Sequence, residues 1–151
     1  MCRLKKMEQS KFKTSIRIAG NNHSCHIAWS SRVDGPMNII GREFPPEYGM
    51  PSKESGDKER LANRTCFFAQ HGLRVNDVAI SKLSHGPEVK YVGEVNNYLE
   101  DLQCDGILAD RRGLALSVAF ADCPSVIIFD VYKPHLVVLH AGWRGISKGI
   151  I

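Results

Sequence analysis

The feature that most constrains the fold is a pair of short apolar runs followed by a glycine-containing turn. The runs are Ser125–Asp130 and His135–His140, and only Val-Tyr-Lys-Pro separates them. Two β-forming runs joined by four turn residues predict a β-hairpin. A turn centred on this linker would place Ser125 opposite His140. Because cross-strand neighbours lie about 5 Å apart, we expect the side chains of Cys123 and His140 to converge at the open end of the hairpin.

The segment after His140, Ala-Gly-Trp-Arg-Gly, is unsuited to continuing a strand. Gly142 and Gly145 favour a tight turn with a close backbone approach, and a helix could begin at Ile146. A strand-to-helix junction exposes backbone N–H groups that suit an anion such as phosphate, and Arg144 adds a fork of donors. The alternative is that the segment packs a turn and binds nothing.

Length and composition are those of one globular domain. The 151 residues are 43% hydrophobic and 24% charged, as in ordinary soluble proteins, and no apolar run approaches the ~20 residues of a membrane span. The net charge of +4 arises mainly near the N-terminus, from Arg3, Lys5, Lys6, Lys11, Lys13 and Arg17. We interpret residues 1–15 as a poorly ordered, solvated basic tail. Neither a nucleic-acid partner nor a membrane partner is expected.

The cysteines indicate a reducing compartment. There are 5 of them, irregularly spaced and without a Cys-x-x-Cys pair, which argues for free thiols rather than a disulfide framework. The N-terminus also lacks the apolar stretch of a secretory signal. We therefore expect a cytoplasmic protein.

The rest of the chain predicts several strands and one long helix. Asp57 is a favourable N-cap, Lys58–His71 carries an apolar helical face, and Gly72 suits the position after a helix. Leu114–Phe120 is almost wholly apolar and predicts a buried central strand. Further strands are expected at Ser24–Trp29, Val75–Leu83, Glu88–Val92 and Ile107–Asp110, with an extended loop over 41–57 and a turn or short helix over Asn96–Gln103. This order predicts an α/β fold, that is, an α+β mixed sheet with flanking helices.

Three residues at predicted strand ends form a candidate site: His85, Cys123 and His140. Three nitrogen and sulfur ligands with one open position are typical of catalytic zinc, which acidifies bound water. A second use of the same residues is a nucleophilic pair, with Cys123 as thiolate and His140 as base. The third interpretation is that Cys123 is a small buried hydrophobe.

Four ordered segments resemble the motifs of the YfiH-type family. They are Ser84-His85-Gly86-Pro87-Glu88-Val89, Asp105-Gly106 with Asp110, Ala121-Asp122-Cys123, and His140-Ala141-Gly142-Trp143-Arg144-Gly145. The last hexapeptide, preceded by Ala-Asp-Cys at this distance, is the most specific. Members of this family have been described as polyphenol oxidases or laccase-domain proteins, as peptidoglycan editing factors, and as purine nucleoside phosphorylases with adenosine deaminase activity.

The resemblance implies a fold and a site. The fold would be the sheet-and-helix arrangement grouped with cysteine-hydrolase-like toxins, and zinc would be held by His85, Cys123 and His140. The other residues implied by position are Asp122 for proton transfer, Arg144 for anion binding, and Arg32 and Asn38 for substrate binding in a shortened N-terminal loop.

The chain departs from the family pattern in three respects. The N-terminal loop has Asp34 where Gly-Gly-x-Ser is usual, and Leu-Ser precedes His85 where a glutamine is usual. The family also continues beyond the Trp-Arg-Gly turn, whereas this chain stops at Ile151. We therefore expect residues 16–151 to form a single YfiH-like domain that lacks roughly its last third, with an uncovered apolar face and weak activity.

The leading hypothesis is a zinc-dependent purine nucleoside phosphorylase with adenosine deaminase activity. Its partners would be phosphate and a purine nucleoside such as adenosine, inosine or methylthioadenosine. The alternatives are a copper-dependent polyphenol oxidase, a Cys-His hydrolase, and a catalytically inactive truncated family member. Copper is an alternative cofactor because thiolate and imidazole ligands accept it more tightly than zinc. The oligomeric state is left open.

Overall fold

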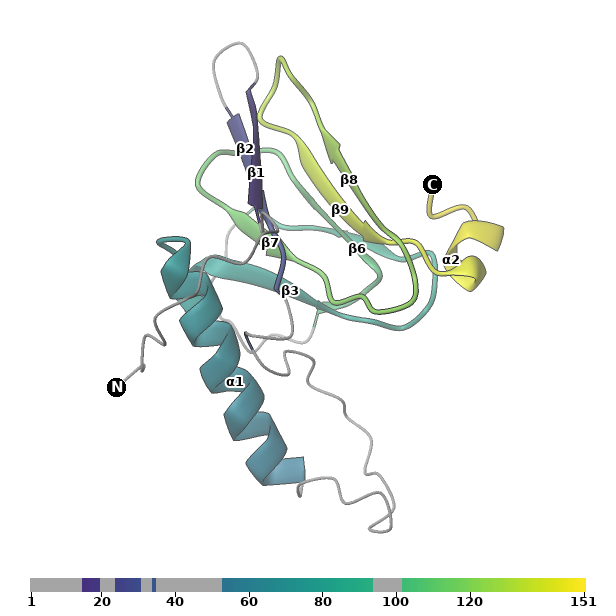
Figure 1. Cartoon of the computed structure of the whole chain (residues 1–151). Coiled ribbons are helices and arrows are strands. Elements are labelled where there is room, and N and C mark those ends of the chain that lie inside the picture. Colours follow the sequence, from purple (N-terminus) through teal and green to yellow (C-terminus); the bar gives the residue numbers. More distant parts are fainter. Residues whose placement is uncertain (1–14, 20–23, 31–33, 35–52, 94–101) are drawn as a thin grey trace. The chain divides into compact units, whose positions relative to one another are not determined.

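The computed structural model describes residues 15–19, 24–30, 34, 53–93 and 102–151 (Figure 1). The chain forms two compact units: unit 1 combines Met1–Arg17 with His26–Gly72, and unit 2 combines Ile18–Cys25 with Leu73–Ile151. Nearly all of the expected basic tail, and most of the expected segments 41–57 and 96–103, lie outside the described residues. No helix in the described part of the chain is long and apolar enough to cross a membrane.

The first regular elements are two short strands, β1 (Ser15–Ala19) and β2 (Ser24–Ala28), which pair as a two-stranded sheet. Strand β2 confirms the strand predicted at Ser24–Trp29. Strand β1 was not predicted, because its residues Ser-Ile-Arg-Ile-Ala follow a polar, basic stretch that lacks β periodicity.

The long helix α1 spans Lys53–Gln70 and belongs to unit 1. Its end agrees with the sequence, because Gly72 follows with φ +75° in the left-handed region that favours glycine. Its start does not. Asp57 lies inside the helix, so its predicted role as N-cap is wrong, and the predicted loop is helical from Lys53. The helix can include residues 53–57 because Gly56 is the only one of them with a strongly unfavourable helix propensity, about 1 kcal/mol.

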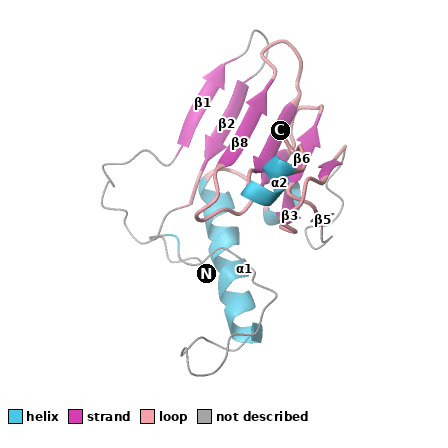
Figure 2. Ribbon diagram, turned by 90° about the vertical axis from the view of Figure 1, so that its right-hand side faces the viewer, coloured by secondary structure: helices cyan, strands magenta, loops and turns pink. Residues whose placement is uncertain are grey.

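Unit 2 contains two further sheets, whose strands are shown in Figure 1 and are coloured magenta in Figure 2. One has the order β5-β3-β7 and is parallel. The other has the order β4-β6-β9-β8, with β4 and β6 parallel and the remaining pairs antiparallel. The bounds are β3 Val78–Lys82, β4 Val89–Tyr91, β5 Leu102–Gln103, β6 Gly106–Ala109, β7 Ala115–Ser117, β8 Ser125–Phe129 and β9 Leu136–His140.

Two of the predicted strands are shorter than expected. The predicted strand Val75–Leu83 opens with one 3-10 turn at Val75–Asp77, and only Val78–Lys82 is extended. Leu114–Phe120 is not a buried central strand. Only Ala115–Ser117 pairs, at the edge of its sheet, and Phe120 is 51% exposed. An apolar run cannot by itself distinguish a central strand from a half-buried edge.

The hydrophobic core of unit 2 includes residues from both of its sheets. Ala79 on β3 packs in one cluster with Ile107 on β6, together with Val92 and Cys104. Cys104 and Ile107 are completely buried. The first residues of β6 are therefore buried, and so is Asp105, the polar residue immediately before them.

The hairpin β8–β9 has the predicted register, from Ser125 opposite His140 to Phe129 opposite Leu136. Its turn is closed by Asp130, whose carboxylate accepts hydrogen bonds from the backbone N–H groups of Tyr132 and Lys133 at 2.8 and 3.1 Å. Strand β9 leads through Gly142 into a short helix, α2 (Trp143–Ser147). The described residues thus form a mixed α/β fold with several sheets and two α-helices.

Candidate functional site

The three residues of the predicted site lie together in unit 2. His85 is in the turn after β3, Cys123 precedes β8, and His140 is the last residue of β9. The rings of His85 and His140 have centroids 5.1 Å apart and are nearly perpendicular, at 86°. His140 is 3% exposed, Cys123 is half-buried, and His85 is exposed. The cluster thus has a buried end at His140 and an open end at His85.

Gly142 lies between Cys123 and His140. A Cβ atom at position 142 would be 3.0 Å from Cε1 of His140, 3.6 Å from its Nε2, and 3.5 Å from Sγ of Cys123. The thiol and the imidazole therefore border the same small space, and the absence of a side chain at Gly142 keeps that space open. The predicted convergence of the two side chains at the open end of the hairpin agrees with this geometry.

The residue that organises the cluster is Asp105, which the sequence reasoning did not include in the site. Its side chain is completely buried. Oδ1 lies 3.0 Å from Nδ1 of His140 and accepts from the His85 N–H at 2.9 Å. Oδ2 accepts from the backbone N–H groups of Ser84 and Gly86 at 3.1 and 2.9 Å, and from the Ser84 hydroxyl at 2.5 Å.

These bonds determine the charge of Asp105. Burial alone would raise the pKa of its carboxyl, but hydrogen bonds from Ser84, Gly86 and His140 together hold that pKa below its ordinary value. The carboxylate is therefore ionised at neutral pH. The sequence contained one signal: an aspartate directly before the apolar run Gly106–Ala109 is drawn into the core, where a carboxylate needs several donors.

Asp122 and Arg144, predicted to act in catalysis, are both exposed. The guanidinium of Arg144 lies 4.9 Å from the ring centroid of Trp143, which is 70% exposed. The described contacts do not bring either residue to the cluster. Two further predicted residues, Arg32 and Asn38, lie outside the described residues.

Helix α2 is in close contact with the turn that carries His85. A Cβ atom at Gly145 would lie 2.8 Å from the carbonyl oxygen of Gly86, so only glycine fits this approach. The junction that contains Arg144 and the turn that contains His85 are therefore neighbours, although neither side chain contacts the other in the described interactions.

The donor set of the cluster suits zinc or copper, because both accept thiolate and imidazole ligands. Within residues 15–19, 24–30, 34, 53–93 and 102–151, no group of three or more His, Cys, Asp or Glu side chains is arranged to hold a metal ion. His85, Cys123 and His140 are thus neighbours that a metal would have to draw together. His140 is already oriented for this, because Asp105 engages Nδ1 and leaves Nε2 available.

The cysteines differ in state. Cys25, Cys104 and Cys123 are free thiols, and burial raises the pKa of Cys25 and of Cys104. Cys66 is disulfide-bonded, so the expectation of free thiols throughout is wrong at that position. Of these three described thiols, Cys123 is the one that adjoins a histidine of the candidate site.

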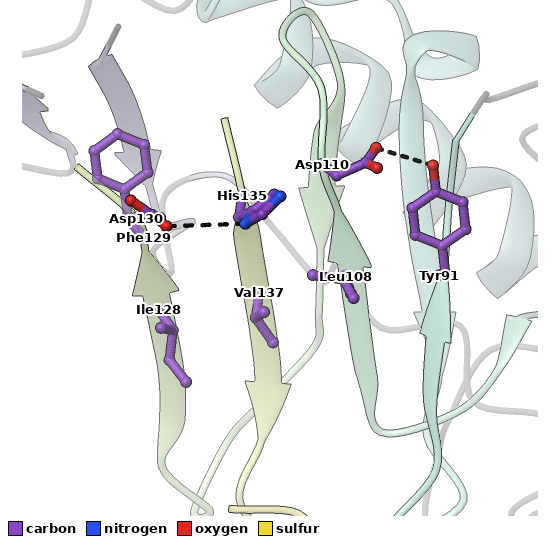
Figure 3. A pocket seen from close by; sticks show the side chains of 8 residues that line it. All are labelled: Tyr91, Leu108, Asp110, Ile128, Phe129, Asp130, His135 and Val137. Atoms are coloured by element: carbon purple, nitrogen blue, oxygen red, sulfur yellow. Dashed lines mark hydrogen bonds and ion pairs between the residues drawn. The ribbon is translucent and has the colours of Figure 1, made fainter. Parts of the chain in front are cut away.

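A separate pocket of about 610 Å³ lies over the four-stranded sheet (Figure 3). Its floor is apolar, and two polar pairs border it: the Tyr91 hydroxyl donates to Asp110 at 2.9 Å, and His135 lies 3.8 Å from Asp130. Asp110, Asp130 and His135 are at the ends of β6, β8 and β9 remote from His140. None of the predicted site residues lines this pocket.

Comparisons with known proteins relate the chain to phosphorylases. It is 32% identical over 91 residues to the purine nucleoside phosphorylase LACC1 of Mus musculus. The matched segment is 60% of this chain and 19% of that protein. It is 33% identical over 90 residues to a purine nucleoside phosphorylase of Mycobacterium bovis, again 60% of this chain and 36% of the relative. A Streptomyces griseus phosphorylase is 28% identical over 143 residues, which is 89% of this chain and 54% of the relative.

Two solved structures are also similar to the chain. The hypothetical protein YfiH of Bacillus licheniformis matches with a TM-score of 0.58 and 26% identity, over 62% of this chain and 38% of that one. The Neisseria meningitidis protein NMB0706 matches with a TM-score of 0.61 and 22% identity, over 91% of this chain and 54% of the other. The second likeness concerns the fold alone.

The chain thus spans between 19% and 54% of the length of these relatives. One further match covers most of the chain and all three residues of the His-Cys-His cluster. Residues 51–151 match the family described as multi-copper polyphenol oxidoreductase laccase, and the chain therefore belongs to this laccase-domain family of the YfiH type.

Proposed function

We propose that the cluster is a zinc-dependent site for purine nucleosides, which cleaves the N-glycosidic bond with phosphate and deaminates adenosine. The observation that carries the proposal is the approach of the His85 and His140 rings, 5.1 Å between centroids, with Sγ of Cys123 at the same space beside Gly142. The substrate class comes from the relatives named as purine nucleoside phosphorylases. Activity in this chain, which spans only part of each relative, is part of the proposal.

The ligand roles follow from the donors present. His140 would bind through Nε2, because its Nδ1 is occupied by Asp105. Cys123 would bind as thiolate, and His85 would complete the set from the exposed side. A zinc ion held there would supply Lewis-acid chemistry for the deamination.

The other predicted residues would handle protons and anions. Asp122, next to Cys123 in the chain and exposed to solvent, would accept and return protons during deamination. Arg144 would hold phosphate or ribose oxygens in the phosphorolysis, since a guanidinium forms paired, charge-assisted hydrogen bonds with such anions. Arg32 and Asn38 would contact the nucleoside.

The test measures metal and turnover in the same preparations of the 151-residue chain. Zinc is measured by elemental analysis, and purine bases and inosine are measured by chromatography after incubation with adenosine and phosphate. Substitution of His85, Cys123 or His140 by alanine should remove most of the zinc, because loss of a ligand destroys such a site, and should remove both activities. His135→Ala is the matched control: this histidine belongs to the same hairpin but borders the separate pocket.

Unchanged metal content in all three ligand variants would overturn the metal assignment. Retained zinc without turnover in the unsubstituted chain would instead identify a metal-binding, catalytically inactive family member. The two halves of the proposal therefore fail separately.

One alternative has a specific observation in its favour, because the family description names copper and polyphenols. Copper binds thiolate and imidazole ligands more tightly than zinc does. A single Cys-His-His cluster is nevertheless far short of the histidine-rich set expected of several coppers. Oxygen consumption with a phenol after copper loading, compared with nucleoside turnover after zinc loading, separates the two activities.

A further inference from the structure

The buried carboxylate of Asp105 connects two of the three candidate ligands, and nothing in the proposed chemistry uses it directly. Each of its oxygens serves a different part of the site. Oδ1 joins the ring of His140 to the backbone of His85, at 3.0 and 2.9 Å. Oδ2 binds the residues on either side of His85, Ser84 and Gly86.

The bond to the ring determines which nitrogen of His140 carries the proton. An ionised carboxylate can only accept hydrogen bonds, so Nδ1 must be the donor. A neutral imidazole with its proton on Nδ1 has a lone pair on Nε2. That nitrogen borders the space beside Gly142 that is shared with Sγ of Cys123. Asp105 therefore keeps His140 in the tautomer that a metal can bind.

The bonds to the backbone maintain an unusual conformation of His85. His85 has φ +59°, in the left-handed region, which is strained for a residue with a side chain. The N–H groups of Ser84, His85 and Gly86 all point at the one carboxylate. Such a set of successive N–H groups around an anion offsets the strain of the turn. Without the carboxylate, the turn would lose the hydrogen bonds that hold the backbone of His85 in this conformation.

We propose that Asp105 is a positioning residue of the His85, Cys123 and His140 site: it sets the tautomer of His140 and the turn of His85 together. The inference rests on the proposed function only for the statement that these residues bind a metal. The two geometric effects belong to the metal-free protein and can be measured there.

The test is Asp105→Asn in the 151-residue chain, with Asp110→Asn as the matched control. Both aspartates flank β6, but Asp110 is exposed and its carboxylate accepts a hydrogen bond from the Tyr91 hydroxyl. The amide has the size of the carboxylate, but its NH2 group cannot accept hydrogen bonds. In either orientation of the amide, some of the N–H and O–H donors around it would therefore face this NH2 group. The first readout is the 15N spectrum of the histidine rings in metal-free protein. The second is zinc affinity by competition with a chromophoric chelator.

In the unsubstituted chain and in Asp110→Asn, His140 should be a single Nδ1–H tautomer. In Asp105→Asn, the ring signals should become those of mixed tautomers or the His85 amide resonance should move. Zinc affinity should fall about 10- to 100-fold, as for other residues that orient metal ligands. An Asp105→Asn protein with an unchanged His140 tautomer, an unchanged His85 amide and unchanged zinc affinity would overturn the proposal.

A second variant and a second measurement decide the question if the first experiment fails. If Asp105→Asn fails to fold, Ser84→Ala removes only the hydroxyl bond, from an exposed residue. It should weaken zinc binding about fivefold or more, as expected for one hydrogen bond to a charged group, and unchanged affinity would count against Asp105. If the unsubstituted chain binds no zinc, the proposed function fails, whereas the ring spectrum of metal-free protein still decides the role of Asp105.

Discussion

His140 is attached to Asp105 twice. Its backbone N–H donates to the Asp105 carbonyl oxygen at 2.7 Å, and its ring Nδ1 lies 3.0 Å from the Asp105 carboxylate. The first bond fixes the end of β9 beside the start of β6, and the second fixes the ring on that backbone. Both residues are buried, so water does not compete for either bond. The ring of His140 is therefore placed before any ligand arrives.

The first prediction concerns the space beside Gly142. Gly142→Ala should weaken zinc binding about tenfold, because the new methyl group would lie 3.0 Å from Cε1 of His140 and 3.5 Å from Sγ of Cys123. The thermal midpoint should change little, since φ −68° at this position suits alanine. Gly93→Ala is the control, because the three atoms nearest its Cβ would belong to the exposed ring of Tyr91. Equal zinc affinity in both variants would show that the space is not needed.

The second prediction concerns the reactivity of Cys123. Iodoacetamide should modify Cys123 before Cys25 and Cys104, because the latter two are buried and burial raises the pKa of both thiols. Added zinc should slow the modification of Cys123 and leave that of the other two unchanged. Peptide mass spectrometry over time measures all three. A covalent adduct between substrate and Cys123 would support the Cys-His hydrolase instead.

The third prediction concerns stability at alkaline pH. Burial raises the pKa of Cys104, an effect that nearby Lys90 opposes and Asp105 reinforces. In the unfolded chain this thiol ionises near its ordinary value of 9.0, whereas in the folded chain it remains protonated to higher pH. The contribution of this thiol to the free energy of unfolding is therefore fully present below pH 9.0, and it is lost as the pH rises through the raised pKa of the folded state.

Urea unfolding between about pH 8 and about pH 10.5 measures this effect. Cys104→Ala should reduce the decline in the free energy of unfolding across that range. Ile107→Val is the control, because it alters the same core cluster without removing a titrating group. A decline of the same slope in both variants would show that Cys104 is not its source.

The fourth prediction concerns the apolar sheet face in Figure 3. Tyr91 and Ile128 border the pocket and are 59% and 51% exposed. Exposed apolar side chains that adjoin one another lower solubility. Ile128→Lys should therefore raise the concentration at which light scattering begins. Tyr132→Lys adds the same charge outside the pocket, at a residue that is 76% exposed, and should have the smaller effect. The reverse order of the two variants would contradict the prediction.

The sequence was most informative where local pattern and geometry coincide. The β8–β9 hairpin was predictable because two apolar runs flank one turn, and turn length alone determines that Ser125 faces His140. The left-handed Gly72 was predictable for a similar local reason.

The features that were missed depend on tertiary contacts. Asp105 accepts hydrogen bonds from residues 84–86 and from His140, which are distant in the chain. Its place before an apolar run indicates burial, but no local pattern identifies these partners. The edge position of β7 depends on which strand pairs with β3, and an apolar run contains no information on pairing. The early start of α1 likewise follows from helix propagation through residues that also suit a loop.

The contact of Gly145 with the carbonyl oxygen of Gly86 has a mechanical consequence. The backbones of α2 and of the His85 turn approach so closely that a methyl group at position 145 would come within 2.8 Å of that oxygen. A displacement of α2 would therefore press on the turn whose N–H groups bind Asp105. We expect the strand-to-helix junction and the His85 turn to move together.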